Sequence, residues 1–264
     1  MVDLVDKGPT SDPITTEVIR GWMESVTDEM QATIIKTAHS QLICEARDAT
    51  CALFDRDGRT AAQASAMPIH LGVLAELGRR FAAQYPAGVA QPGDLYITND
   101  PYAGGTHMPD IAISAPVFYD DELVGYVSTM AHHKDIGGLL PASVSVKARD
   151  IHAEGLRLPI MRIASAGEMN DDLMTVIVAC SRSPQSFRGD LGAQMTGDHL
   201  GEHGEQLMRD LWFSEEPCFE LGEVARMSAF NQVGGQGQRC TGKADEWDDR
   251  VGFVSRKADR IHHV

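Results

Sequence analysis

Residues 94–119 read DLYITNDPYAGGTHMPDIAISAPVFY, in which a polar loop, 99–110, separates two apolar stretches that alternate as strands do. The loop carries an imidazole at His107 and a carboxylate three residues later at Asp110. Groups at this spacing can converge on one cation. They can also form hydrogen bonds in a loop that holds no metal. The stretch predicts two strands joined by a loop that is a candidate metal site.

Another strand-like stretch, 123–130, follows 111–119 after a short acidic connection, which favours an antiparallel hairpin. Pairing across this hairpin returns the chain to the polar loop. His132 is therefore expected beside that loop. Successive residues of a strand point to opposite faces, so at most one of His132 and His133 faces the site, and the other is a candidate supporting contact.

The flanking segments predict helices and a second hairpin. We expect a long amphipathic helix from Pro13, a hairpin around the Asp57-Gly58 turn, and further helical segments over 70–84 and 170–187. The predicted fold class is α+β, a mixed fold of antiparallel hairpins with the long N-terminal helix packed on the sheet.

Composition divides the chain into three parts. A polar leader covers 1–12, and the patterned region covers 13–212. Residues 213–264 are rich in Gly, Gln and charged side chains and show neither helical nor strand periodicity, which predicts a poorly ordered tail.

Charge and cysteine content narrow the class of protein. With 23 Lys and Arg against 38 Asp and Glu, the net charge of −15 argues against nucleic-acid and anionic-membrane partners. The 5 cysteines form no Cys-x-x-Cys pair, which favours reduced thiols. No apolar run approaches the ~20 residues that span a bilayer, and the first residues lack a secretory pattern. We expect a soluble cytoplasmic protein.

Four motifs carry a resemblance to a known family. In this order, NDPYAGGTHMPDIAISAPVF, AHHKDIGG, EGLRLP and RGDLGAQ resemble the hydantoinase B family, which includes N-methylhydantoinase B subunits and the B half of 5-oxoprolinases. The resemblance covers roughly 12–212. Members of that family are longer, so the chain resembles an N-terminal portion of them followed by an unmatched tail.

The resemblance implies the metal-dependent B component of an ATP-dependent cyclic amide hydrolase. An A-type partner would bind ATP and phosphorylate the ring oxygen, and the B component would deliver metal-bound water to the activated ring. A small cyclic amide substrate and a hetero-oligomer are therefore expected. Neither Gly104-Gly105 nor Gly234-Gly235 meets the P-loop spacing, so ATP is expected to come through the partner.

The resemblance also implies functional residues, motif by motif. The implied ligands of a divalent zinc or manganese ion are Asp48, His107, Asp110 and His132. The residues implied to act catalytically or to support the ligands are His133, Asp135 and Glu154. Asp48 enters this set through the resemblance, since charged residues before a strand usually face solvent.

Two alternatives remain open. The α subunits of ketone carboxylases share the family framework, and bicarbonate dependence would identify that reaction. The chain could also be a non-catalytic, shortened remnant that binds an A-type partner without turnover. One departure from the family pattern is Cys180-Ser181-Arg182, which stands where Asn-x-Arg is common.

Overall fold

The computed structural model describes residues 13–65, 68–141 and 145–212, all within the unit Met1–Glu215. The predicted leader (1–12) and tail (213–264) lie outside the described residues. The helices are α1 (Pro13–Thr37), α2 (Gln41–Cys44), α3 (Pro68–Gln84), α4 (Asp171–Ala179) and α5 (Pro184–Trp212), with short 3-10 turns η1 (Pro101–Ala103) and η2 (Ile151–Ala153). The strands are β1 (Ala49–Asp55), β2 (Thr60–Gln63), β3 (Leu95–Thr98), β4 (Asp110–Tyr119), β5 (Glu122–His132), β6 (Met161–Ser165) and β7 (Glu168–Met169).

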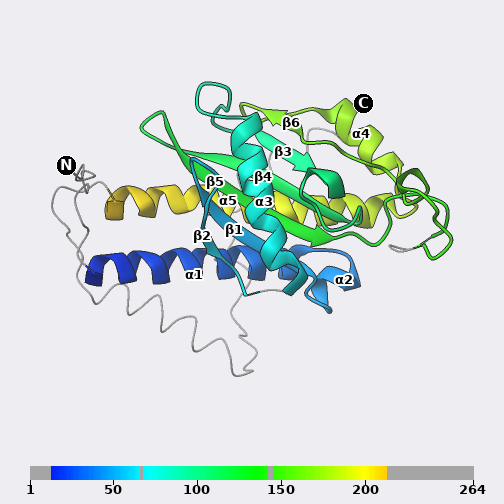
Figure 1. The fold of residues 1–264 in the computed structure, drawn as a ribbon, viewed down its shortest axis with the longest axis horizontal. Coiled ribbons are helices and arrows are strands. Elements are labelled where there is room, and N and C mark those ends of the chain that lie inside the picture. The colour runs from blue at the N-terminus through cyan, green and yellow to red at the C-terminus, as the bar shows by residue number, and fades with distance from the viewer. Residues whose placement is uncertain (1–12, 66–67, 142–144, 213–264) are drawn as a thin grey trace, which may run out of the picture. The chain divides into compact units, whose positions relative to one another are not determined.

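All the strands form one antiparallel sheet in the order β2-β1-β5-β4-β3-β6-β7. Helix α3 covers one face, and α1 and α5 cover the other (Figure 1). The predicted β4–β5 hairpin lies at the centre. Its two turn residues, Asp120 and Asp121, have φ values of 46° and 65°, the left-handed conformation that tight hairpin turns require. The predicted α+β class, with the N-terminal helix packed on the sheet, is confirmed.

Strand alternation assigns each residue to one of the two faces. In β1, Ala49 and Cys51 pack in the core that contains Met30 of α1. The intervening Ala52 packs in the core that contains Leu74 of α3. The same alternation runs through β4 and through β5 from Tyr126 onward, where even-numbered residues face α3 and odd-numbered residues face α1 and α5. An irregularity in the β4–β5 register reverses it at Leu123 and Val124.

The segment 170–187, expected to be one helical stretch, is two helices. Helix α4 ends at Ala179, and α5 begins at Pro184 and runs beside α1 (Figure 1). Several glycines lower the helix propensity of α5 and hide it from sequence analysis. Gly197 has a packing reason, because a Cβ there would lie 2.8 Å from Cγ1 of Ile34. The close approach of α1 thus requires glycine at position 197, although glycine lowers the helix propensity of α5.

None of the described helices is long and apolar enough to cross a membrane.

Candidate metal centre

Three neighbouring strands bring the predicted ligands together at one end of the sheet. In the order β1-β5-β4, Asp48 immediately precedes β1, His132 ends β5 and Asp110 begins β4. Asp110 pairs directly with His132, and the backbone amide of His132 donates to the carbonyl of Asp48 at 3.0 Å. All three positions are even-numbered and face α3. His133 is odd-numbered and faces α5, so the expectation that the adjacent histidines diverge is confirmed.

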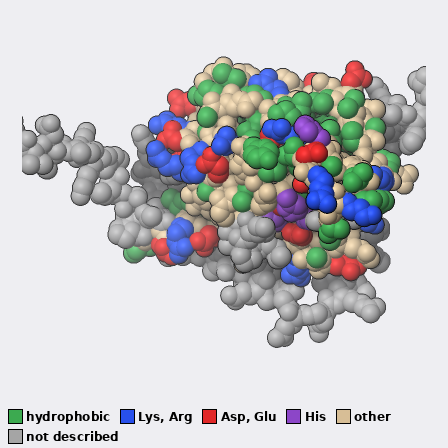
Figure 2. Space-filling view, turned by 45° about the vertical axis from the view of Figure 1, so that its right-hand side comes forward, with side chains coloured by type: hydrophobic (Ala, Val, Ile, Leu, Met, Phe, Trp, Pro, Cys, Tyr) green, Lys and Arg blue, Asp and Glu red, His purple; other side chains and the backbone are tan. Residues whose placement is uncertain are grey.

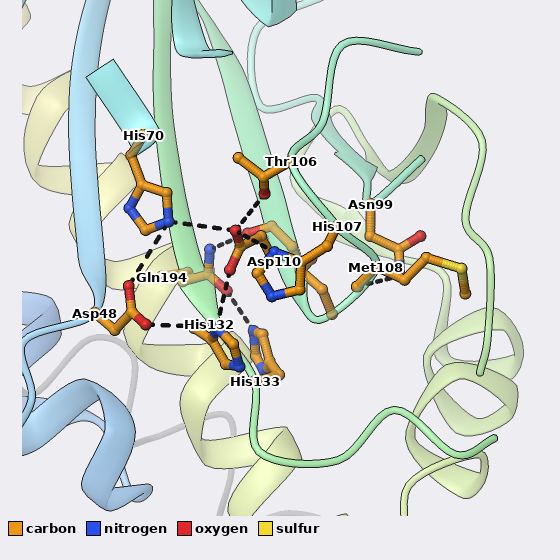
Figure 3. Close-up of polar contacts among 11 residues, drawn as sticks. Asp48, His70, Asn99, Thr106, His107, Met108, Asp110, His132, His133 and Gln194 are labelled. Atoms are coloured by element: carbon orange, nitrogen blue, oxygen red, sulfur yellow. Dashed lines mark hydrogen bonds and ion pairs between the residues drawn. The ribbon is translucent and has the colours of Figure 1, made fainter. Parts of the chain in front are cut away.

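The polar loop before β4 is fixed at both ends by one side chain, Asn99. Its carboxamide nitrogen donates to the carbonyl of Met108 at 2.8 Å (Figure 3). The same nitrogen donates to the carbonyl of Leu156 at 2.8 Å, and the carboxamide oxygen accepts from the amide of Leu158 at 2.6 Å. Asn99 is buried, so these bonds satisfy polar groups that water cannot reach. The EGLRLP motif therefore fastens the loop that carries His107.

Five side chains from four segments of the chain converge at this end of the sheet (Figure 3). We call them the cluster; they are Asp48, His70, His107, Asp110 and His132. Each carboxylate of the pair Asp48 and Asp110 meets more than one imidazole. The separations are His132 Nδ1 to Asp110 Oδ1 3.3 Å, His132 Nδ1 to Asp48 Oδ2 3.4 Å, His107 Nδ1 to Asp110 Oδ2 3.2 Å, His70 Nε2 to Asp110 Oδ2 3.3 Å and His70 Nε2 to Asp48 Oδ1 3.7 Å.

The donor set fits a divalent cation. One ligating atom from each of His107, Asp110 and His132 lies within 4.8 Å of the other two. Donor atoms that share one cation at ~2.1 Å are about 3.0–3.5 Å from one another. The observed imidazole-to-carboxylate separations, including that between His132 and Asp48, fall in this range. Mixed imidazole and carboxylate donors suit zinc or manganese.

Charge within the cluster shifts the pKa of its members. Burial would raise the pKa of Asp110, but hydrogen bonds from His132, His70 and Thr106 outweigh burial and hold that pKa well below its usual range. Burial would lower the pKa of His132, but its hydrogen bond to Asp110 and the two nearby carboxylates raise it overall. Burial lowers the pKa of His107 despite the proximity of Asp110. The carboxylates of Asp110 and Asp48 therefore give the cluster a negative charge, which favours the binding of a proton or a cation.

Metal affinity is expected to fall as the pH decreases through the raised pKa of His132. A metal ligand must be unprotonated, so a proton on this imidazole competes with the cation. Below that pKa the affinity should drop about tenfold per pH unit for one displaced proton. His107, with its lowered pKa, adds no competition near neutral pH. Zinc titration calorimetry in buffers of different ionisation enthalpy measures the released proton, and an affinity that is constant from about pH 6 to 8 contradicts the prediction.

The residues predicted to act beside the metal lie in three different environments. His133 is fully buried, and its Nε2 lies 2.8 Å from Oε1 of Gln194. Because the amide nitrogen of Gln194 donates to the carbonyl of Ile111 at 2.9 Å, its oxygen accepts and His133 Nε2 carries the proton. His133 thus ties β5 to α5 on the face of the sheet opposite the cluster.

Asp135 is engaged by Arg182 and does not join the cluster. Its carboxylate accepts from the backbone amide of Arg182 at 3.0 Å and from the guanidinium at 3.1 Å. Arg182 thus pairs with the buried carboxylate of Asp135. It does so although Cys180 stands where the family pattern has Asn. Glu154 is exposed at the end of η2, and its side chain makes no hydrogen bond or ion pair among the described residues.

Sequence analysis missed His70 and Thr106. His70 precedes the apolar stripe Leu74, Leu77 and Phe81 at spacings of four, seven and eleven, so it shares the face of α3 that packs on the sheet. That spacing is the signal that could have revealed it. Thr106 donates a short hydrogen bond to Oδ2 of Asp110, and no local pattern marks it.

The cluster opens to solvent on the His107 side. The His107 side chain is 34% exposed, whereas those of His132 and Asp110 are 12% and 0% exposed. Tyr102, on the same loop, is 74% exposed, and the guanidinium of Arg157 lies 5.7 Å from its ring centre. Figure 2 shows histidine side chains reaching the surface on the face of the molecule that it presents. His107 is therefore the part of the trio His107, Asp110 and His132 that is most accessible from solvent.

Comparisons with known proteins show which family the chain resembles. The profile of the family described as Hydantoinase B/oxoprolinase matches residues 12–211. The caprolactamase β chain of Pseudomonas jessenii is 36% identical over 73% of the chain and 33% of that protein. The Dictyostelium discoideum 5-oxoprolinase is 32% identical over 76% of the chain and 16% of that protein.

Solved structures agree as well. The structure of the ATP-dependent caprolactamase from Pseudomonas jessenii superposes with a TM-score of 0.73 at 32% identity, covering 86% of this chain and 39% of that one. An acetone carboxylase superposes with a TM-score of 0.70 at 18% identity over 75% of this chain, a likeness of fold alone. The chain spans well under half the length of each of these relatives.

Proposed function

Because the chain belongs to the hydantoinase B/oxoprolinase family, we propose that it is the metal-dependent B component of an ATP-dependent cyclic amide hydrolase. The observation that carries the proposal is the convergence of imidazole nitrogens and two carboxylates on one point in a protein of this family. Relatives named as a caprolactamase component and a 5-oxoprolinase support the reaction class.

The proposed ligands are Asp48, His107, Asp110 and His132. When bound, a divalent cation lowers the pKa of a coordinated water so that hydroxide becomes available near neutral pH. Asp110 and Asp48 supply negative charge that holds the cation in place. His107 is the most exposed of the four, so it lies where the ring of the substrate would meet the site.

The proposal includes an A-type partner that binds ATP and activates the ring. Support comes from the names of two relatives, the β component of a caprolactamase and the B component of a putative D-/L-hydantoinase, which denote parts of larger enzymes. The caprolactamase of known structure is described as ATP-dependent. The complete P-loop motif does not occur in the sequence, because Gly237, Gly242 and Lys243 have its spacing but Ala244 stands at the Ser or Thr position.

The test is reconstituted turnover. The full chain would be loaded with zinc or manganese, mixed with a candidate A-type partner and ATP, and assayed with caprolactam, 5-oxoproline and hydantoins. Ring opening should require ATP, the partner and the metal, and Asp110→Asn should abolish it while His152→Gln, at an exposed site in η2, should not. Turnover that requires bicarbonate would establish a carboxylase instead. Metal-loaded complex without turnover on any ring would contradict the proposal.

A further inference from the structure

His70 is a polar side chain in an otherwise apolar stripe. It is 1% exposed, and the residues that follow it on the same face of α3, Leu74, Leu77 and Phe81, are fully buried. An imidazole in such a position costs free energy unless its polar atoms are paired. Its Nδ1 has no hydrogen-bond partner among the described residues. The polar contacts of His70 are therefore made through Nε2.

Both contacts of Nε2 are carboxylate oxygens. Nε2 lies 3.3 Å from Oδ2 of Asp110 and 3.7 Å from Oδ1 of Asp48 (Figure 3). These two aspartates are separated in the sheet by β5, and α3 passes over that face. His70 thus contacts, from α3 above the sheet, the same two carboxylates that His132 contacts from β5 within it.

His70 and His132 face different oxygens of each carboxylate, and Oδ2 of Asp110 is also met by Thr106 and His107. Asp48 presents Oδ1 to His70 and Oδ2 to His132, and Asp110 presents Oδ2 to His70 and Oδ1 to His132. His132 belongs to the compact trio with His107 and Asp110, and His70 does not. His70 therefore contacts the carboxylates on oxygens other than those that meet His132.

We propose that His70 is a positioning residue that aligns Asp48 and Asp110 for cation binding through a proton on Nε2. The inference rests on the proposed metal-dependent function. In it, His70 contacts two of the ligands and does not contact the cation. A donor in this place fixes the rotation of both carboxylates, so that their remaining oxygens point to one cation. In the metal-free chain, the same donor also reduces the electrostatic repulsion between the carboxylates of Asp48 and Asp110.

The experiment compares the wild-type chain with His70→Leu, His70→Gln and the exposed control His152→Gln. Glutamine can place an amide N–H near the position of Nε2, and leucine cannot. Zinc affinity is measured by competition with a chelator, and the absorption spectrum of the cobalt-loaded chain reports the ligand set. Thermal unfolding of each metal-free variant confirms that it is folded.

The expected loss of affinity is about 10- to 100-fold for His70→Leu, with most of it restored in His70→Gln. The cobalt spectrum at saturation should match the wild type in both, because the ligands are unchanged. Affinity within about twofold of wild type in His70→Leu would overturn the proposal. A cobalt spectrum that shows loss of a nitrogen ligand would overturn it too, because His70 would then be a ligand.

A second measurement separates this inference from the proposed function. If the wild-type chain binds no cation at all, the proposed function fails, but the position of the His70 proton can still be observed. Long-range ¹H–¹⁵N spectra of the metal-free chain with labelled histidine should show a protected proton on Nε2 of His70, absent in His70→Gln. A His70 ring without a proton on Nε2 refutes the positioning role.

Discussion

Replacing His132 or His107 with alanine is expected to abolish stoichiometric metal binding. Each imidazole supplies a neutral nitrogen ligand to the compact trio, and its loss leaves two carboxylates and a single imidazole, a set that should not retain the cation through desalting. The affinity should fall by more than the ~10- to 100-fold that follows from losing a residue behind a ligand. Elemental analysis of the purified chain after loading and desalting is the measurement.

The matched control is His152→Ala. His152 is an exposed histidine in η2, so it tests whether any histidine on the surface retains metal. It should retain the wild-type metal content. Equal metal content in all three variants would show that the cluster does not bind the cation. A wild-type chain that holds no metal after reconstitution would favour a non-catalytic, partner-binding role.

The Gly58→Ala substitution is expected to lower the free energy of unfolding by about 2–5 kcal/mol. Gly58 occupies the predicted turn between β1 and β2 with a φ of 76°, and a Cβ there would lie 2.4 Å from the carbonyl oxygen of Gly78 in α3. The left-handed conformation alone costs an alanine roughly 1–2 kcal/mol. Overpacking against the backbone adds about 1–3 kcal/mol, because a helix backbone cannot move aside as a side chain can.

Gly88→Ala isolates the conformational part of this cost. Gly88 has a φ of 86°, but nothing lies within 4 Å of the position that its Cβ would take. It should lose only roughly 1–2 kcal/mol. Urea unfolding of the two variants measures the difference. Equal losses would mean that the turn does not dock on α3 as described. Since α3 carries His70, the weakened Gly58 variant should also bind zinc less tightly.

The central hairpin and the direction of the His132 side chain were predictable because short-range pattern determines them. Alternation in 111–119 and 123–130, with the acidic turn between them, predicted the strands that became β4 and β5. The strand period of two then places His132 and His133 on opposite faces whatever the rest of the chain does. The contact between His107 and Asp110 follows from their spacing in one loop.

Other parts of the site depend on which strands and helices become neighbours. Asp48 shares imidazole partners with Asp110 only because β1 and β4 both flank β5. No local sequence pattern predicts that strand order. His70 arrives from a helix that crosses the sheet, so its partners are 22 and 40 residues away in sequence. Helix α5 is stabilised by packing on α1 in spite of glycines that weaken it alone.

The α+β class, the central hairpin and the loop that carries His107 and Asp110 thus follow from the amino-acid sequence alone. Their physical basis is local, in the strand period, the turn residues and the spacing of side chains within one segment. Asp48 was expected through the family resemblance, whereas the contacts of His70 with Asp48 and Asp110, and of Arg182 with Asp135, are visible only in the folded chain. These pairs form when the chain folds and buries polar side chains that are far apart in sequence. Because water is excluded there, the side chains form hydrogen bonds and ion pairs with one another.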